Sequence, residues 1–152
     1  MSLLITGLPA ELFRPLFALS DAELQARGGV RRIAEGGEPC RVSLTDAGPG
    51  DALILVNHEH HAVASPYRMR YAIFVRPGEA RFEAVDRIPE QLTRRTLAVR
   101  SFNGAGMNLA HRLVDGAALG ETAEDLLADP AATYLHVHFA SAGCYAARIE
   151  RA

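Results

Sequence analysis

Two histidines and a cysteine near the C-terminal end are the residues best suited to chemistry. Residues 133–139 alternate between apolar and polar types. Because successive side chains of a strand point to opposite faces, His136 and His138 share one face. A turn that contains Gly143 follows, and a second run of β-type residues starts at Cys144. The two runs predict a hairpin with a polar, potentially reactive face.

The register of this hairpin decides which polar side chains meet. Matching the apolar faces of the two runs gives three pairs: Leu135 with Ile149, Val137 with Ala147, and Phe139 with Tyr145. Each large apolar side chain buried in this way contributes roughly 1.5–3 kcal/mol. A shift by one residue would instead turn the charge of Arg148 inward, which is costly. We therefore expect Cys144 and Arg148 on the same face as His136 and His138.

Such a face would support metal or thiol chemistry. A strand rises by about 3.3 Å per residue, so the Cβ atoms of His136 and His138 lie roughly 6.6 Å apart. With Cys144 as a third ligand, this pair could hold Zn²⁺. Alternatively, His138 could activate Cys144 as a nucleophile. Histidine pairs also occur on half-solvated sheet faces without a ligand, and we predict no cofactor.

Four further side chains are candidates for ligand binding: Arg41, Tyr67, Arg68 and Arg148. A guanidinium group binds a carboxylate or a phosphate through two parallel hydrogen bonds. Pro66 favours an extended or turn conformation around Tyr67, which could hold the phenol ring at the mouth of a pocket. The alternative role of each arginine is a surface ion pair with a nearby carboxylate, which contributes little to stability.

A second group of histidines, His58, His60 and His61, follows an apolar run at residues 52–56. They could add to the C-terminal pair, or they could form a solvated strand end. The sequence leaves their convergence open. Cys40 alternates with apolar residues, so we expect a buried thiol at this position.

The hydrophobic patterns predict one α+β domain over residues 1–152, built mainly from an antiparallel sheet with a few short peripheral helices. Residues 40–45 and 52–56 are expected to form neighbouring antiparallel strands, the second buried on both faces. Further strands are predicted at residues 3–6, 30–34, 71–75, 81–85, 97–102 and 107–114. Ser20 and Glu23 form a capping-box pattern that predicts a short helix. Other helices are predicted at residues 89–95 and 121–128.

Composition restricts the class of protein. The chain has 152 residues, of which 49% are hydrophobic and 22% charged, as is usual for a globular domain. Its net charge of −2 gives no attraction to nucleic acid. No apolar run approaches the ~20 residues that span a bilayer, and the N-terminus lacks a basic leader. We therefore expect a cytoplasmic protein with reduced cysteines, without membrane or nucleic-acid partners; a homo-oligomer is compatible with the sequence.

Several segments together resemble a bacterial family, the domain of unknown function number twelve hundred and three. The segments are residues 39–47, 65–68, 73–76, 136–138 and 143–144. The resemblance spans almost the whole chain. The chain departs from the family pattern at two places. The family tends to have Asn and Pro at the positions of Phe139 and Ala142, and Gly and Pro at the positions of Tyr71 and Ala72. The resemblance implies one compact bacterial domain and no assigned activity.

Three functions are consistent with these residues. The first is binding of a small, anionic ligand in a pocket lined by histidine, arginine and tyrosine. The second is an enzyme that uses His136, His138 and Cys144 with a metal or through the thiol. The third is a protein-interaction module. The sequence favours the first.

Overall fold

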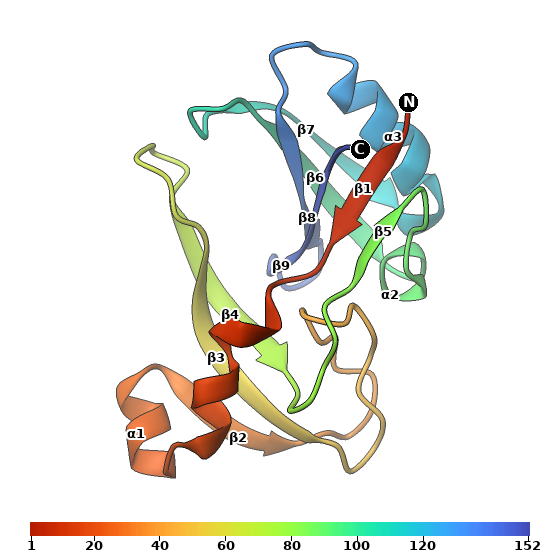
Figure 1. The fold of residues 1–152 in the computed structure, drawn as a ribbon. Helices are drawn as coiled ribbons and strands as arrows, with labels where there is room; N and C mark the ends of the chain where they lie inside the picture. Colours follow the sequence, from red (N-terminus) through yellow and green to blue (C-terminus); the bar gives the residue numbers. More distant parts are fainter.

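The computed structural model describes all 152 residues, and its strands form two antiparallel sheets (Figure 1). In spatial order the larger sheet contains β5 (Glu83–Val85), β1 (Leu3–Thr6), β9 (Tyr145–Arg151), β8 (Tyr134–Phe139), β6 (Thr96–Phe102) and β7 (Asn108–Asp115). The smaller sheet contains β2 (Gly29–Ile33), β3 (Ala52–His61) and β4 (Met69–Val75). The predicted α+β class, mainly antiparallel with short helices, is confirmed.

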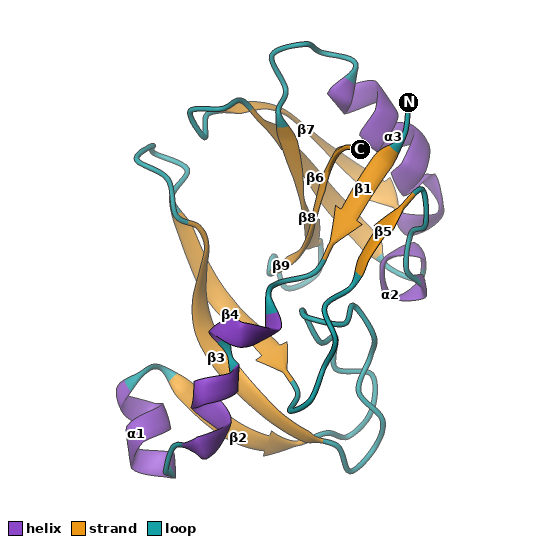
Figure 2. Cartoon of the chain, in the orientation of Figure 1, coloured by secondary structure: helices purple, strands orange, loops and turns teal.

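The helices are short, and the longest of them packs against the larger sheet (Figure 2). They are α1 (Asp21–Ala26), α2 (Glu90–Thr93) and α3 (Leu119–Leu127), with 3-10 turns at Ala10–Leu12, Arg14–Ala18 and Gly116–Ala118. The capping box that predicts α1 is confirmed, because the Ser20 hydroxyl accepts a bond from the Glu23 N–H at 3.2 Å. None of the helices is both long and apolar enough to cross a bilayer.

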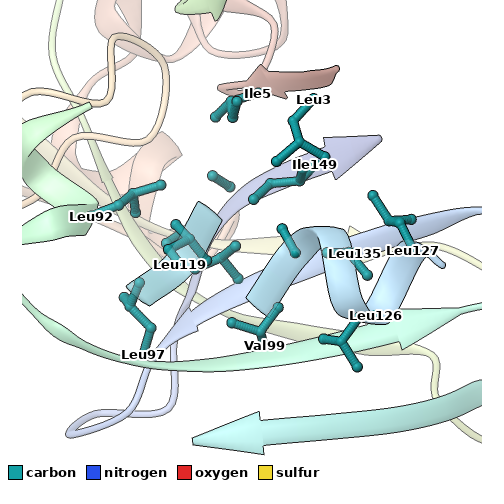
Figure 3. Close-up of a cluster of buried hydrophobic side chains, with 14 of the residues drawn as sticks. Leu3, Ile5, Leu92, Leu97, Val99, Leu119, Leu126, Leu127, Leu135 and Ile149 are labelled. Carbon is teal, nitrogen blue, oxygen red and sulfur yellow. The ribbon is translucent and has the colours of Figure 1, made fainter. Parts of the chain in front are cut away.

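The largest apolar core lies between α3 and the larger sheet (Figure 3). It contains 18 buried residues. Leu135 and Val137 enter it from β8, and Leu119 and Leu127 enter it from the other side. Because side chains alternate along a strand, this packing leaves the histidines of β8 on the opposite face. The core therefore fixes the direction in which the candidate site points.

The predicted strand at residues 40–45 is wrong. Cys40 makes only an isolated parallel bridge with Phe74, and Leu44 has a φ of 52°, a left-handed conformation that no strand contains. The segment is a loop, and Arg76 holds its polar side chains by hydrogen bonds to the hydroxyls of Ser43 and Thr45. Its backbone groups bond separately to Leu8, Phe74 and Phe82, and these bonds stand in place of a regular strand ladder.

The neighbours of β3 are therefore β2 and β4. The strand is nevertheless the central one of its sheet, as predicted. Leu53 and Ile54 are 2% and 1% exposed and enter two different apolar clusters. The prediction that this strand is buried on both faces is confirmed for these residues.

The β8–β9 hairpin contains a bulge that the predicted register omits. The pairs Leu135–Ile149 and Val137–Ala147 are confirmed. Beyond them the register shifts, and His138 rather than Phe139 lies opposite Tyr145. The small residue Ala146 is the extra residue, and the turn closes through a 2.9 Å bond from the Phe139 N–H to the Cys144 carbonyl. The bulge reverses the faces of Tyr145 and Cys144 relative to the prediction.

We expect Leu135→Ala to lower the free energy of unfolding by roughly 2–5 kcal/mol, the usual cost of a cavity in a well-packed core. Leu135 is fully buried, whereas Leu113 is 73% exposed on the edge strand β7. Leu113→Ala is thus the matched control, with an expected change within about 0.5 kcal/mol. Urea unfolding followed by circular dichroism measures both. Equal effects of the two substitutions would contradict the assigned faces of β8.

Candidate functional site

A cavity of ≈ 390 Å³ lies between the histidine face of β8 and the end of the β3–β4 hairpin. Four elements supply its principal side chains: His136 and His138 from β8, Arg100 and Phe102 from β6, His60 and His61 from β3, and Tyr67 and Arg68 from the β3–β4 loop. The site thus depends on contact between the two sheets.

Strand pairing positions the β6 side chains. Arg100 lies opposite His136, and Phe102 lies opposite Tyr134. Paired residues of antiparallel strands share a face, so Arg100 and Phe102 point to the same side as the histidines. The ring centroids of Phe102 and His136 are 5.3 Å apart. The larger sheet therefore presents one continuous surface of imidazole, guanidinium and phenyl groups.

An irregularity at the end of β3 brings two more histidines into the cavity. The β3–β4 register shifts between His58 and His61, so His60 and His61 both line the cavity. The Nδ1 atom of His61 lies 2.8 Å from the Tyr67 carbonyl oxygen, and its Nε2 atom lies 2.7 Å from the Tyr134 hydroxyl. His58 packs against Phe13 instead. His60 and His61 thus join the C-terminal pair, and His58 does not.

The tips of two hairpins touch above the cavity (Figure 1). The Ser65 hydroxyl donates a hydrogen bond to the Gly106 carbonyl oxygen at 2.9 Å. Gly106 has a φ of 75°, and a Cβ atom there would lie 2.8 Å from Val63. Glycine is therefore needed for this close approach between the β3–β4 and β6–β7 loops.

Burial keeps three histidines of the site, His60, His136 and His138, neutral. It lowers the pKa of His136 to about 2, of His60 to about 3 and of His138 to about 4, and neighbouring positive charges add to the effect. The His138 Nδ1 lies 3.0 Å from the Gly143 carbonyl oxygen, which can only accept. In the neutral ring Nδ1 therefore donates and Nε2 is an acceptor.

Arg100 is the one cation of the cavity without a carboxylate partner. No aspartate or glutamate lines the cavity. Its guanidinium donates a hydrogen bond to the Met69 sulfur at 3.5 Å. Burial lowers the pKa of Arg100, and no acidic group opposes this shift. Arg68, by comparison, is exposed and paired with Glu59 at 3.1 Å. The cavity therefore has unmatched positive charge at Arg100.

His60 has unused hydrogen-bonding capacity. Its ring stacks on Tyr145 with centroids 4.8 Å apart, and neither of its buried nitrogens has a hydrogen-bond partner. Its centroid lies 5.3 Å from that of His138 and 6.0 Å from that of His136. Even so, no three histidine, cysteine, aspartate or glutamate side chains of the protein are arranged to hold a metal ion. The two ring nitrogens of His60 are therefore buried beside the cavity with their hydrogen-bonding capacity unused.

The structure brings together four of the side chains predicted to bind a ligand: Tyr67, Arg68, His136 and His138. Arg148 lies on the same sheet face, but its guanidinium covers the Tyr134 ring at 3.9 Å and pairs with Glu150 at 3.0 Å. It does not line the cavity.

Two predicted site residues lie elsewhere. Arg41 is 1% exposed and contacts the β8–β9 turn. Cys144 packs in the core with Phe139, so its predicted position beside His136 and His138 is wrong. The bulge at Ala146 is the physical cause, because it turns Tyr145 rather than Cys144 towards the histidines. Neither the Zn²⁺ trio nor the Cys144–His138 pair is assembled.

Sequence analysis missed Arg100 and Phe102. Their signal is the alternation of Ala98, Arg100 and Phe102 along a strand whose other face is apolar. That pattern places Arg100 on a polar face, but it does not say which strand lies beside it. Pairing between β6 and β8, which makes Arg100 a neighbour of His136, is a property of the topology.

Comparison with known proteins agrees with the resemblance in sequence. The family model described as "Protein of unknown function (DUF1203)" matches residues 37–151. The chain belongs to this family. The DUF1203 match includes all the strands that line the cavity, β3, β4, β6, β7 and β8. No curated protein and no solved structure matches the chain.

We expect acid to destabilise this DUF1203 protein through its neutral histidines. An unfolded histidine has a pKa near 6.5, above the value of about 2 for His136 in the fold. Between these values the unfolded state binds more protons, so the free energy of unfolding falls as the pH falls. His136→Gln should remove about 1.6 kcal/mol of the decrease between pH 6.5 and pH 5.

Urea unfolding at the two pH values measures this decrease. His111→Gln, at an exposed position of β7 that borders the cavity, is the control for the removal of a histidine and should reduce the decrease by less than His136→Gln does. If His136→Gln has the same pH dependence as the wild type, His136 is not held neutral by the fold.

Proposed function

We propose that this DUF1203 protein binds a small organic anion in the cavity between its two sheets. The observation that carries the proposal is Arg100, a half-buried guanidinium in a cavity without any acidic side chain. Partial burial of a charge without a partner is costly, and a bound carboxylate or phosphate would offset that cost. A ligand anion completes the site electrostatically.

The other walls of the cavity suit the remainder of such a ligand. Phe102 and Tyr67 offer aromatic surfaces whose ring centroids are 6.2 Å apart. The Nε2 atom of neutral His138 and the unpaired nitrogens of His60 offer hydrogen bonds without adding charge. The volume of ≈ 390 Å³ lies at the small end of the range for ligand pockets, about 300–1,000 Å³. A single-ring aromatic acid is a ligand of the appropriate size and polarity.

The enzymatic alternatives have less support. Both the zinc and the thiol reaction use Cys144 beside His136 and His138, and Cys144 lies on the opposite face of the hairpin. An interaction module would need no enclosed cavity and would leave Arg100 without a role. Ligand binding accounts for more of the observed geometry.

Isothermal titration calorimetry with benzoate and its neutral analogue benzamide tests the proposal. We expect benzoate to bind and benzamide to bind at least tenfold more weakly. Arg100→Gln should weaken benzoate binding by roughly 10- to 100-fold, because hydrogen bonds to charged groups contribute about 1.5–3 kcal/mol. The control is Arg112→Gln on the neighbouring strand, where the side chain is exposed and outside the cavity.

Inorganic phosphate in the same titration distinguishes a preference for phosphate from one for carboxylates. Equal binding of benzoate and benzamide, or unchanged binding to Arg100→Gln, would contradict the proposal. Stoichiometric zinc in the purified protein, detected by mass spectrometry, would favour the metal-dependent alternative instead.

A further inference from the structure

A second cavity, of ≈ 480 Å³, lies at the other face of the β8–β9 turn. Its walls include Leu55, Tyr71, Phe74 and Phe139, and Arg41 and Cys144 also line it. None of these residues lines the histidine cavity. The two cavities therefore present different chemistry on the two sides of one hairpin.

Arg41 is a buried cation without a carboxylate partner. Its side chain is among the largest that are fully buried, and its Nε donates to the Tyr145 carbonyl oxygen at 2.7 Å. One terminal nitrogen donates to the Pro39 carbonyl oxygen, and the other lies 3.0 Å from the Cys144 sulfur. Arginine stays protonated in proteins, and an uncompensated buried charge costs several kcal/mol. The two carbonyl oxygens and the Phe139 ring, whose centroid lies 4.9 Å from the guanidinium carbon, compensate part of this charge. A negative group nearby would compensate the rest.

The sulfur of Cys144 is the acidic group that Arg41 contacts. Burial lowers the pKa of Arg41, and the neighbouring Cys144 is the largest influence that opposes this shift. A hydrogen bond from a cation stabilises the thiolate form of cysteine, which is the nucleophilic form. Cys144 is 8% exposed, and its side chain forms part of the wall of the second cavity.

Cys40 has the opposite environment. It is completely buried, and desolvation raises its pKa to about 12. Both cysteines are free thiols, as predicted. The protein thus contains one inert thiol, Cys40, and one thiol that contacts a cation, Cys144. The reactivity of Cys144 can therefore be compared with that of Cys40 in the same molecule.

We propose that Cys144 and Arg41 form a thiolate–guanidinium pair that captures apolar α,β-unsaturated carbonyl compounds in the second cavity. The apolar and aromatic walls suit the hydrocarbon part of such a molecule. The sulfur of Cys144 bonds to the β-carbon, and the π electrons of the C=C bond move onto the α-carbon and carbonyl oxygen as an enolate. The α-carbon then takes a proton from water, and the negative charge leaves as hydroxide. No group leaves, and no oxidant or reductant is consumed.

N-ethylmaleimide, a compound of this class, tests the proposal on the full chain. Intact mass spectrometry and peptide mapping should show one adduct at Cys144 and none at Cys40. The rate at pH 6 should be within about threefold of the rate at pH 8. N-acetylcysteine, in contrast, should react close to 100-fold more slowly at pH 6 than at pH 8. The reason is that the thiolate fraction of an ordinary thiol with a pKa near 8.5 falls about tenfold per pH unit.

Arg41→Met should lower the Cys144 rate at pH 6 by at least tenfold. Arg94→Gln is the control, because Arg94 is exposed, pairs with Glu90 at 3.6 Å and does not line the second cavity. Its rate should change less than threefold. An Arg41→Met variant with the wild-type rate would overturn the proposal. If that variant does not fold, the wild-type pH profile decides, and a profile like that of N-acetylcysteine refutes the pair.

Discussion

The strand β8 is buried on both faces, and the candidate site depends on this constraint. All six of its residues are buried. On one face Leu135 and Val137 pack in the core beneath α3. On the other face, the end of the β3–β4 hairpin covers His136 and His138. These two polar side chains are therefore buried, although the polar face of a sheet is usually exposed to water. A shift of register by one residue would move Leu135 and Val137 into the polar cavity and the histidines into the apolar core. The register of β8 is therefore fixed.

Covering a histidine face makes the imidazoles neutral and concentrates positive charge at one place. Protonation of His60, His136 or His138 would put further charges beside Arg100 in a partly dehydrated cavity. The neutral rings instead offer hydrogen bonds, and Arg100 remains the unmatched charge. This division between neutral polar groups and one cation favours recognition of an anion over acid–base chemistry that needs a protonated imidazole at neutral pH.

Sequence patterns predicted those elements whose signal is local. The capping box of α1, the alternation of β8 and the apolar run of β3 each depend on a few neighbouring residues, and all three are confirmed. The predicted strand at residues 40–45 is absent because its backbone bonds separately to Leu8, Phe74 and Phe82, each more than 30 positions away, and turns at the left-handed Leu44. Alternation alone cannot detect such a partner.

The site was predictable in part for the same reason. His136 and His138 share a face by alternation, but the position of Cys144 depended on one bulged residue, Ala146. Arg100 is identified as a site residue only by the pairing of β6 with β8, which places it opposite His136. Pairing order and bulges depend on the whole fold, so the sequence identified the histidines and not the cation beside them.

A two-dimensional NMR titration that records arginine Nε–Hε resonances tests the central claim, that Arg100 receives an anion in the histidine cavity. Assignment follows from the resonance lost in Arg100→Gln. We expect benzoate to shift the Arg100 signal progressively to saturation, together with the ring signals of His136, while exposed arginines such as Arg112 stay unchanged. Saturable shifts confined to other arginines, or an Arg100 signal that does not respond to benzoate or to phosphate, would contradict the account.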